Sequence, residues 1–156
     1  MAIIFEGGLL ADYHQFYLAD AAGGTAFPLS FPEEVQRNRV QVAAGLLVVV
    51  TARNMIVPLQ VELHAAEPGF SIEPPDHVVV AGLRSAGLLV VAGLTDYGPD
   101  AARVRVPPGD LHAMVISRGL GTLSADGLDG QDRYEVHLWP GRAEGVRVLR
   151  QWTGSS

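Results

Sequence analysis

The sequence predicts an all-β domain, an antiparallel sandwich of two sheets with at most one short helix. Three observations lead to this expectation. Short segments with alternating apolar and polar residues, or with a Val/Leu-rich apolar run, recur along the chain of 156 residues. Turns rich in glycine and proline separate them at intervals of roughly ten residues. Helical periodicity is almost absent. A jelly roll or a closed barrel is the alternative arrangement of such strands.

Composition limits the class of protein. Apolar residues make up 48% of the chain and charged residues 18%, which is typical of one folded domain. We expect a single domain over residues 1–153 and a disordered tail at 154–156. The absence of cysteine excludes disulfides and thiolate chemistry. No secretion signal is evident, and no apolar run approaches the roughly 20 residues that span a bilayer. The expected protein is therefore cytoplasmic, with no membrane contact.

The charge balance bears on possible partners. The formal net charge is −6, and every basic residue is an arginine or a histidine. Without a cluster of basic residues the chain lacks the groups that neutralise phosphates, so nucleic acid is not an expected partner. An acidic surface is compatible with a basic protein partner.

The segment 11–18 is expected to be the strand around which the sheets assemble. Three aromatic residues and a histidine lie within five positions there. Read with a period of two, one face carries Tyr13, Gln15 and Tyr17, and the other carries His14 and Phe16.

The chain between residues 30 and 65 is expected to hold a short helix and two strands. Ser30, followed by two glutamates, resembles a helix start. The continuous valine and leucine run within residues 39–51 indicates one strand buried on both faces. Residues 57–65 alternate cleanly, with Val57 and Val61 on the apolar face and His64 on the polar face.

The remaining chain is expected to be strands joined by turns. Residues 78–84 and 89–95 are similar in sequence and are interpreted as a β-hairpin. Residues 103–106 and 111–117 are read as strands on either side of a Pro-Gly turn. Two more strands are expected, in residues 133–138 and 146–152.

Two patterns in the sequence suggest a metal site, but neither has the spacing that such a site requires. The five histidines fall on separate segments without an H-x-H pair, and parity turns His64 and His137 toward solvent. Asp126, Asp129 and Asp132 are spaced three apart, whereas a calcium loop needs oxygen ligands at alternate positions. We therefore expect no cofactor and no metal site.

The candidate binding residues are aromatic and polar groups of the kinds enriched at recognition surfaces. They are Tyr13, His14, Gln15 and Tyr17, with Trp139 as a further stacking surface. No arrangement typical of a catalytic site accompanies them, so a non-enzymatic binding domain is the expected class.

One family resembles this chain at that segment. The motif Tyr13-His14-Gln15-Phe16, on an early strand of a largely β chain of this length, looks like the bacterial competence protein J family. Residues 108–111 and 134–138 fit the same outline. The resemblance implies a small cytosolic protein that binds and inhibits a DNA-entry nuclease, which would be the basic partner. The long loop at 118–132 and the Trp139-Pro140-Gly141 ending depart from that outline.

Two other function classes stay open. A sandwich of this size could bind a small ligand or a carbohydrate through Tyr13, Tyr17 and Trp139, and a metal-dependent enzyme would use histidines. The exposed strand edges of a sandwich also allow a homodimer.

Overall fold

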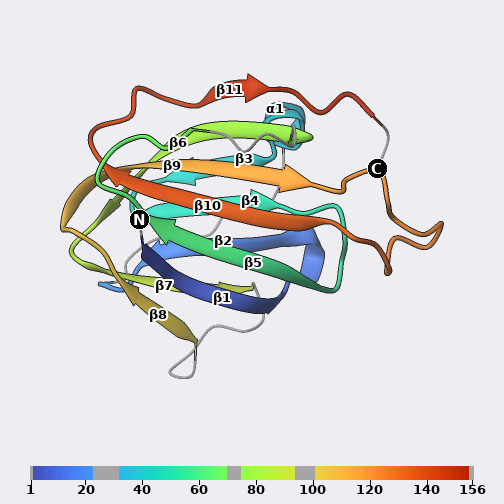
Figure 1. Ribbon diagram of the computed structural model, residues 1–156, viewed down its shortest axis with the longest axis horizontal. Coiled ribbons are helices and arrows are strands. Elements are labelled where there is room, and N and C mark those ends of the chain that lie inside the picture. Colours follow the sequence, from blue (N-terminus) through green and yellow to red (C-terminus); the bar gives the residue numbers. More distant parts are fainter. Residues whose placement is uncertain (1, 23–31, 70–74, 94–100, 155–156) are drawn as a thin grey trace.

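The computed structural model describes residues 2–22, 32–69, 75–93 and 101–154, and they form two packed β-sheets (Figure 1). The first sheet has six strands, in the order β1 (Ala2–Leu10), β5 (Ile56–Leu63), β10 (Arg133–Pro140), β9 (Gly109–Arg118), β6 (His77–Ser85) and β11 (Arg147–Arg150). The second has five, in the order β3 (Val40–Ala43), β4 (Leu46–Val50), β2 (Gln15–Asp20), β7 (Leu88–Gly93) and β8 (Ala102–Arg105). The predicted all-β, two-sheet class is confirmed, and the sheets do not close into a barrel.

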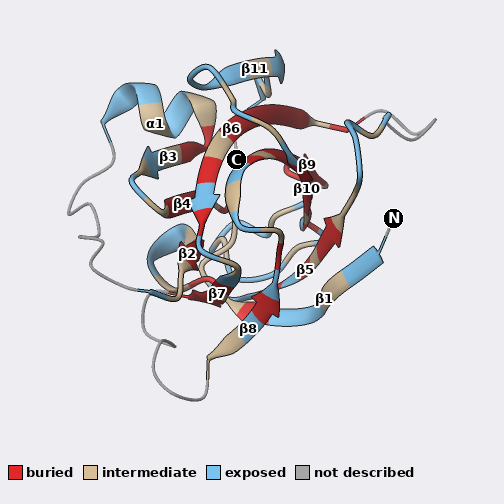
Figure 2. Cartoon of the chain, turned by 90° about the vertical axis from the view of Figure 1, so that its left-hand side faces the viewer, coloured by how far each residue is buried: buried red, intermediate tan, exposed pale blue. Residues whose placement is uncertain are grey.

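Alternation of apolar and polar residues explains how the sheets pack. Side chains from the inner faces of both sheets form one buried cluster, which includes Phe16, Leu47, Val61, Val115 and Val136. Figure 2 shows the two sheets as separate layers, with buried residues along the strands between them. Because successive side chains of a strand point to opposite faces, the residues between the inward ones lie on the outer faces.

The described pairings depart from a purely antiparallel arrangement at one place. β10 runs parallel to β5, with Tyr134 opposite Leu59 and His137 opposite Glu62, while the other described strand pairs are antiparallel. This parallel pair was not among the sequence-based expectations. A parallel pair cannot be joined by a short hairpin, and about 70 residues of chain separate these two strands.

Several strand boundaries differ from the sequence-based expectation. The predicted strand at 11–18 begins only at Gln15, because residues 12–14 form a single 3₁₀ turn between β1 and β2. The expected strand at 39–51 is a hairpin, with Gly45 at φ 68° in the turn that joins β3 to β4. Glycine adopts such a backbone without the steric cost of a Cβ. β1 was not among the expected strands.

The predicted hairpin at 78–84 and 89–95 is also wrong in topology. β6 belongs to the six-stranded sheet and β7 to the five-stranded sheet, so the chain changes sheets between the two similar segments. Both segments are apolar because each supplies an inner face to the same core. Of the predicted second segment, residues 94 and 95 lie outside the described residues.

One short helix, α1 (Glu33–Asn38), lies beside β3, as expected. Glu33 and Glu34 occupy its first turn, where acidic side chains favour the positive end of the helix dipole. Ser30, the expected cap, lies outside the described residues, as do residues 155–156 of the expected tail. No helix in the described ranges is long and apolar enough to cross a membrane.

A buried polar network joins the two sheets at one end of the core. The Tyr134 hydroxyl donates to Asp132 Oδ2 at 2.7 Å and accepts from the backbone N–H of Ala52 at 2.8 Å. Arg53 Nε lies 2.8 Å from Asp132 Oδ1, and the Asp132 side chain is fully buried. Burial raises the pKa of the Tyr134 hydroxyl well above its usual value, which keeps the hydroxyl neutral.

We predict that Tyr134→Phe lowers the free energy of unfolding by about 1–3 kcal/mol, because the Ala52 N–H and the Asp132 carboxylate lose their shared partner inside the protein. The same substitution at Tyr13, which is 63% exposed, should change stability by less than about 0.5 kcal/mol. Urea denaturation of both variants measures the difference. Equal losses would show that the hydroxyl network is not stabilising.

His77 gives the fold a pH dependence. Its fully buried ring donates from Nε2 to the carbonyl of Asn38 at 2.8 Å, while Nδ1 accepts from the backbone N–H of Trp152 at 3.0 Å. The ring must be neutral to accept that bond. Burial lowers the pKa of His77 below its ordinary 6.5. The unfolded chain therefore takes up the proton first as the pH falls.

The contribution of His77 to stability is thus present above about pH 6.5 and is lost as the pH falls below it. We expect the melting temperature of the wild-type chain to drop more steeply between pH 7.5 and 5.5 than that of His77→Gln. Thermal unfolding across this range provides the comparison, and parallel curves for the two proteins would contradict it.

Candidate functional site

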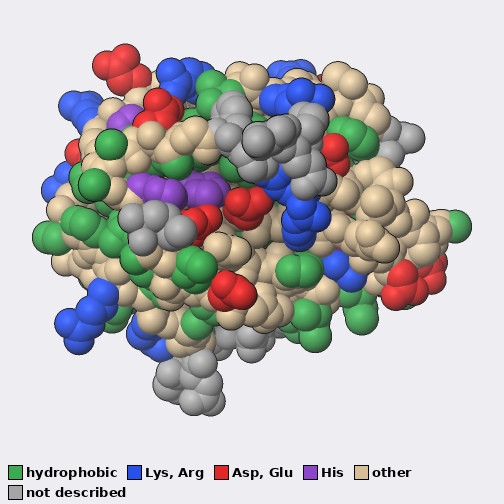
Figure 3. All heavy atoms as spheres, in the orientation of Figure 1, with side chains coloured by type: hydrophobic (Ala, Val, Ile, Leu, Met, Phe, Trp, Pro, Cys, Tyr) green, Lys and Arg blue, Asp and Glu red, His purple; other side chains and the backbone are tan. Residues whose placement is uncertain are grey.

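The outer face of the six-stranded sheet carries a group of interacting polar side chains, here called the polar cluster. Its members come from β9, from β10 and from the end of β5, and they are Glu62, His64, Arg118, Glu135 and His137. The parallel register places His137 directly opposite Glu62. His64 follows the last residue of β5, and its backbone N–H donates to Leu138 O, which fixes it beside β10. Figure 3 shows adjoining histidine side chains next to acidic ones on this face.

His137 is the centre of the polar cluster. Its Nε2 lies 3.1 Å from Glu135 Oε1, its Nδ1 lies 2.9 Å from His64 Nε2, and the same Nδ1 lies 3.3 Å from Glu62 Oε2. Because a carboxylate accepts hydrogen bonds, Nε2 of His137 carries the proton in the bond to Glu135. The two imidazole rings are tilted by 35°, with 5.1 Å between their centroids. His137 is only 7% exposed.

Glu135 holds the ring of His137 in place. Its other oxygen, Oε2, accepts from Arg118 Nε at 2.9 Å. The hydrogen bonds from His137 and Arg118 lower the pKa of Glu135 to about 2, against the opposing effect of burial. The carboxylate is therefore ionised throughout the neutral range. Burial, and then the nearby His137, lower the pKa of His64.

The structure brings together two histidines that were expected to face solvent on separate strands, and it leaves His137 largely buried. His64 and His137 do lie on the polar faces of their strands, as parity predicts, but those faces belong to adjacent strands of one sheet. A signal in the sequence could have indicated this. Glu62-Leu63-His64 and Glu135-Val136-His137 repeat the pattern Glu-x-His, and this spacing puts both groups on one face of a strand. Arg118 carries no comparable signal.

The other three histidines lie outside the polar cluster. His77 is buried in the contacts described above. The ring of His112 stacks on Trp139, with 5.0 Å between centroids and an interplanar angle of 8°. His14 is exposed in the 3₁₀ turn before β2.

Apolar residues continue the outer face of the same sheet beyond the polar cluster. Val78, Val80, Met114, Ile116 and Trp139 form a buried group there. Trp139 is only 6% exposed. This predicted stacking surface is thus a packed residue beside the polar cluster.

The remaining predicted binding residues lie elsewhere. Tyr13 and His14 occupy the turn before β2 at φ 60° each, and the Tyr13 N–H donates to Asn54 Oδ1 at 2.8 Å. Gln15 pairs with Val50 in the five-stranded sheet. Tyr17 is 3% exposed and packs with Leu46 and other apolar residues. Tyr17 and Trp139 belong to separate buried groups, one on each sheet, so the structure does not bring these two rings together.

Two carboxylates of the acidic loop before β10 make contacts within the fold. Asp126 accepts from the backbone N–H of Leu128 at 3.0 Å in a local turn, and Asp132 belongs to the buried network described above. The three carboxylates do not form a converging group among the residues that the structure describes.

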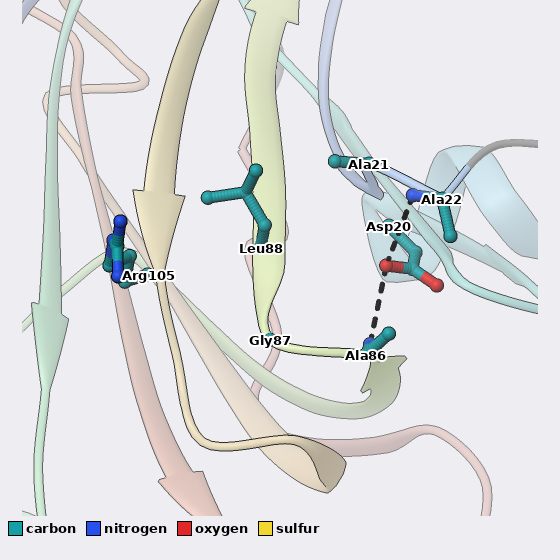
Figure 4. Close-up of a pocket in the computed structure, with 7 residues that line it drawn as sticks. All are labelled: Asp20, Ala21, Ala22, Ala86, Gly87, Leu88 and Arg105. Atoms are coloured by element: carbon teal, nitrogen blue, oxygen red, sulfur yellow. Dashed lines mark hydrogen bonds between the residues drawn. The ribbon is translucent and has the colours of Figure 1, made fainter.

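Two hollows at the surface could hold a ligand. Figure 4 shows one of about 440 Å³ at the corner between β6 and β7. Its carboxylate, Asp20, accepts from the backbone N–H of Ala86 at 3.3 Å and of Ala22 at 3.5 Å, so it holds the corner together. The other, of about 340 Å³, lies between β1, β5 and β10 beside the polar cluster, and Glu6, Gln60, Arg133 and Glu135 contribute to its lining.

The class of protein is thus a two-sheet β-sandwich with a polar outer face on its larger sheet. The sequence matches no protein-family model, and it matches no curated protein. Two solved structures share the fold. One is ComJ from Bacillus subtilis, an inhibitor of the DNA-degrading activity of NucA, with a TM-score of 0.67 and 16% identity over 88% of this chain and 96% of that one. The other is crocagin biosynthetic gene J, with a TM-score of 0.61 and 19% identity over 91% of this chain and 100% of that one.

The predicted resemblance to the competence protein J family is therefore confirmed at the level of the fold. The motif at residues 13–16, on which the resemblance was based, contributes a turn and the first residues of β2.

We predict that Arg118 and Glu135 are coupled by about 1.5–3 kcal/mol in a double-mutant cycle, since both side chains are largely shielded from water. Arg84 and Asp110 form a matched pair on the surface, 3.4 Å apart with side chains 73% and 43% exposed. Their coupling should be about 0.2–1 kcal/mol. Chemical denaturation of the single and double alanine variants measures both values. Similar couplings for the two pairs would mean that the polar cluster is effectively solvated.

Proposed function

We propose that this chain is a non-enzymatic, cytosolic binding domain that inhibits a DNA-degrading nuclease. The observation behind the proposal is the fold shared with ComJ, which extends over 88% of this chain and 96% of that one. Because two chains that share a fold along nearly their whole lengths can present a binding face on the same strands, a related mode of protein recognition is the simplest expectation. Fold alone does not determine function, so the proposal also depends on charge and surface.

Charge supports the same kind of partner. The net charge is −6, and a nuclease binds the phosphates of DNA with basic groups. An acidic protein is attracted to such a surface and can cover it. Complementary charges mainly accelerate association and set the orientation of the partners.

We assign the contact surface to the outer face of β1, β5 and β10. Glu6, Gln60 and Glu135 line the hollow on this face, and Glu62 lies one row further along β5. The strands hold these side chains at fixed spacing, so little conformational entropy is lost when a partner binds. The occupant is a basic face of a nuclease.

Geometry gives less support to the alternative of a small ligand or a carbohydrate bound by stacking. Of the three aromatic residues considered for that role, Tyr17 and Trp139 are 3% and 6% exposed, and only Tyr13 presents a ring to solvent. Three rings that do not share a surface cannot form a common stacking platform.

The proposal is tested by capture and then by inhibition. Immobilised chain is incubated with lysate of its own source cells at low and at high salt, and retained proteins are identified by mass spectrometry. We expect a basic nuclease that is retained at low salt and released at high salt, because screening weakens the attraction. Adding free chain to the eluted nuclease should then abolish DNA degradation at a one-to-one ratio. A retained nuclease that stays fully active would exclude inhibition.

Two charge reversals locate the contact surface. Glu6→Arg changes an exposed residue on the proposed surface, and Glu33→Arg makes the same change in net charge on the exposed helix α1. The Glu6 variant should associate at least about tenfold more slowly with the nuclease, and the Glu33 variant should lose much less. Equal effects would assign the attraction to total charge and remove this surface from the proposal.

A further inference from the structure

Three metal-ligating atoms converge in the polar cluster. They are a carboxylate oxygen of Glu62, Nε2 of His64 and Nδ1 of His137, and all lie within 4.8 Å of one another. Two of the separations are 2.9 Å, between the imidazole nitrogens, and 3.3 Å, between His137 Nδ1 and Glu62 Oε2. The ligand atoms of a tetrahedral zinc site with bonds of about 2.1 Å lie about 3.4 Å apart. The 3.3 Å separation is close to this spacing, and the 2.9 Å separation would lengthen by about half an ångström when the hydrogen bond between the two rings is replaced by an ion.

The placement of the protons around His137 also favours a metal ion at this position. In the tautomer that donates from Nε2 to Glu135, Nδ1 of His137 presents a lone pair. The carboxylate of Glu62 presents lone pairs at the same place. The Nε2–H of His64 can donate either to His137 Nδ1 or to the Glu62 carboxylate. The acceptor that receives no hydrogen bond then faces the other acceptor. One divalent cation would satisfy all three groups together.

Glu135 and Arg118 supply the support that metal-bound histidines usually have. A ligating histidine normally donates its second ring N–H to a carboxylate, which fixes the ring orientation and increases its basicity. Here Glu135 accepts from His137 at 3.1 Å and is itself held by Arg118 at 2.9 Å. Nothing else in the described part of the chain combines three potential ligands in this way.

We propose that Glu62, His64 and His137 form a binding site for a divalent transition-metal ion, with zinc as the expected ion. Two imidazoles and one carboxylate, without thiolates, suit zinc, and they also bind nickel and copper. With three protein ligands, a fourth position is available to water or to a side chain of a bound protein. Glu135 is a positioning residue for His137. The site is inferred from these contacts alone and does not depend on the proposed inhibition of a nuclease.

The test uses the full untagged chain, stripped of metal by a chelator and then freed of the chelator. Zinc chloride is added in a calorimetric titration, and cobalt(II) is added with its visible absorption recorded. We expect saturable binding of one ion per chain, an intense cobalt spectrum typical of four-coordination, and a higher melting temperature with zinc. No saturable uptake of either ion would overturn the proposal.

Variants separate this site from adventitious binding by histidines. His64→Gln and His137→Gln should each weaken zinc binding more than about 100-fold, and Glu135→Gln should weaken it about 10–100-fold. His112→Gln, on the same face of the sheet but outside the cluster, should bind within about twofold of the wild type. Binding unchanged in both ligand variants would overturn the assignment.

A further variant covers the case in which a histidine variant fails to fold, as judged by circular dichroism without metal. Glu62→Gln keeps the shape of the side chain and removes its charge. It should weaken zinc binding at least about tenfold and alter the cobalt spectrum. A spectrum and affinity equal to those of the wild type would exclude Glu62 as a ligand.

Discussion

The rest of the structure depends on the carboxyl group of Asp132, which is fully buried at one end of the core beside Arg53. An unpaired charge at such a position would cost several kcal/mol. Here Arg53 and the Tyr134 hydroxyl compensate it from two sides, and the Ala52 N–H anchors that hydroxyl. Ala52 and Arg53 follow the five-stranded sheet, whereas Tyr134 opens β10 of the six-stranded sheet. The two sheets are therefore joined by directional bonds as well as by apolar packing, which fixes how β10 enters its sheet.

The position of β10 determines the outer face. With Tyr134 fixed against the core, Glu135 and His137 must point outward, because side chains alternate along a strand. The parallel register with β5 then places His137 opposite Glu62. The same strand thus contributes to the core through one face and to the polar cluster through the other. The proposed contact surface and the proposed metal site share this strand, although each is inferred from different observations.

The alternation of inward and outward residues could be predicted from the sequence, but little of the pairing between strands distant along the chain could be. Alternation in residues 57–65 and 133–138 correctly assigned inward and outward residues, because that pattern reflects burial on one face. The pairing of β6 with β9 and of β7 with β2 could not be predicted, since similar apolar segments fit either sheet. The polar cluster was missed for the same reason: parity indicates the face on which His64 lies, but only the strand order shows that His137 is its neighbour. The turn at Tyr13 replaced an expected strand, because two residues there adopt left-handed backbone.

The parallel pairing of β5 with β10 also has a consequence for the order of folding. His64 and His137 lie 73 positions apart along the chain. Contacts so distant along the chain form late, because the intervening loop must be closed first, and folds dominated by them fold in milliseconds to seconds. A chain emerging from the ribosome thus has no polar cluster until β10, about 70 residues after β5, has been synthesised. Activities that depend on this face are absent from nascent fragments that end before β10.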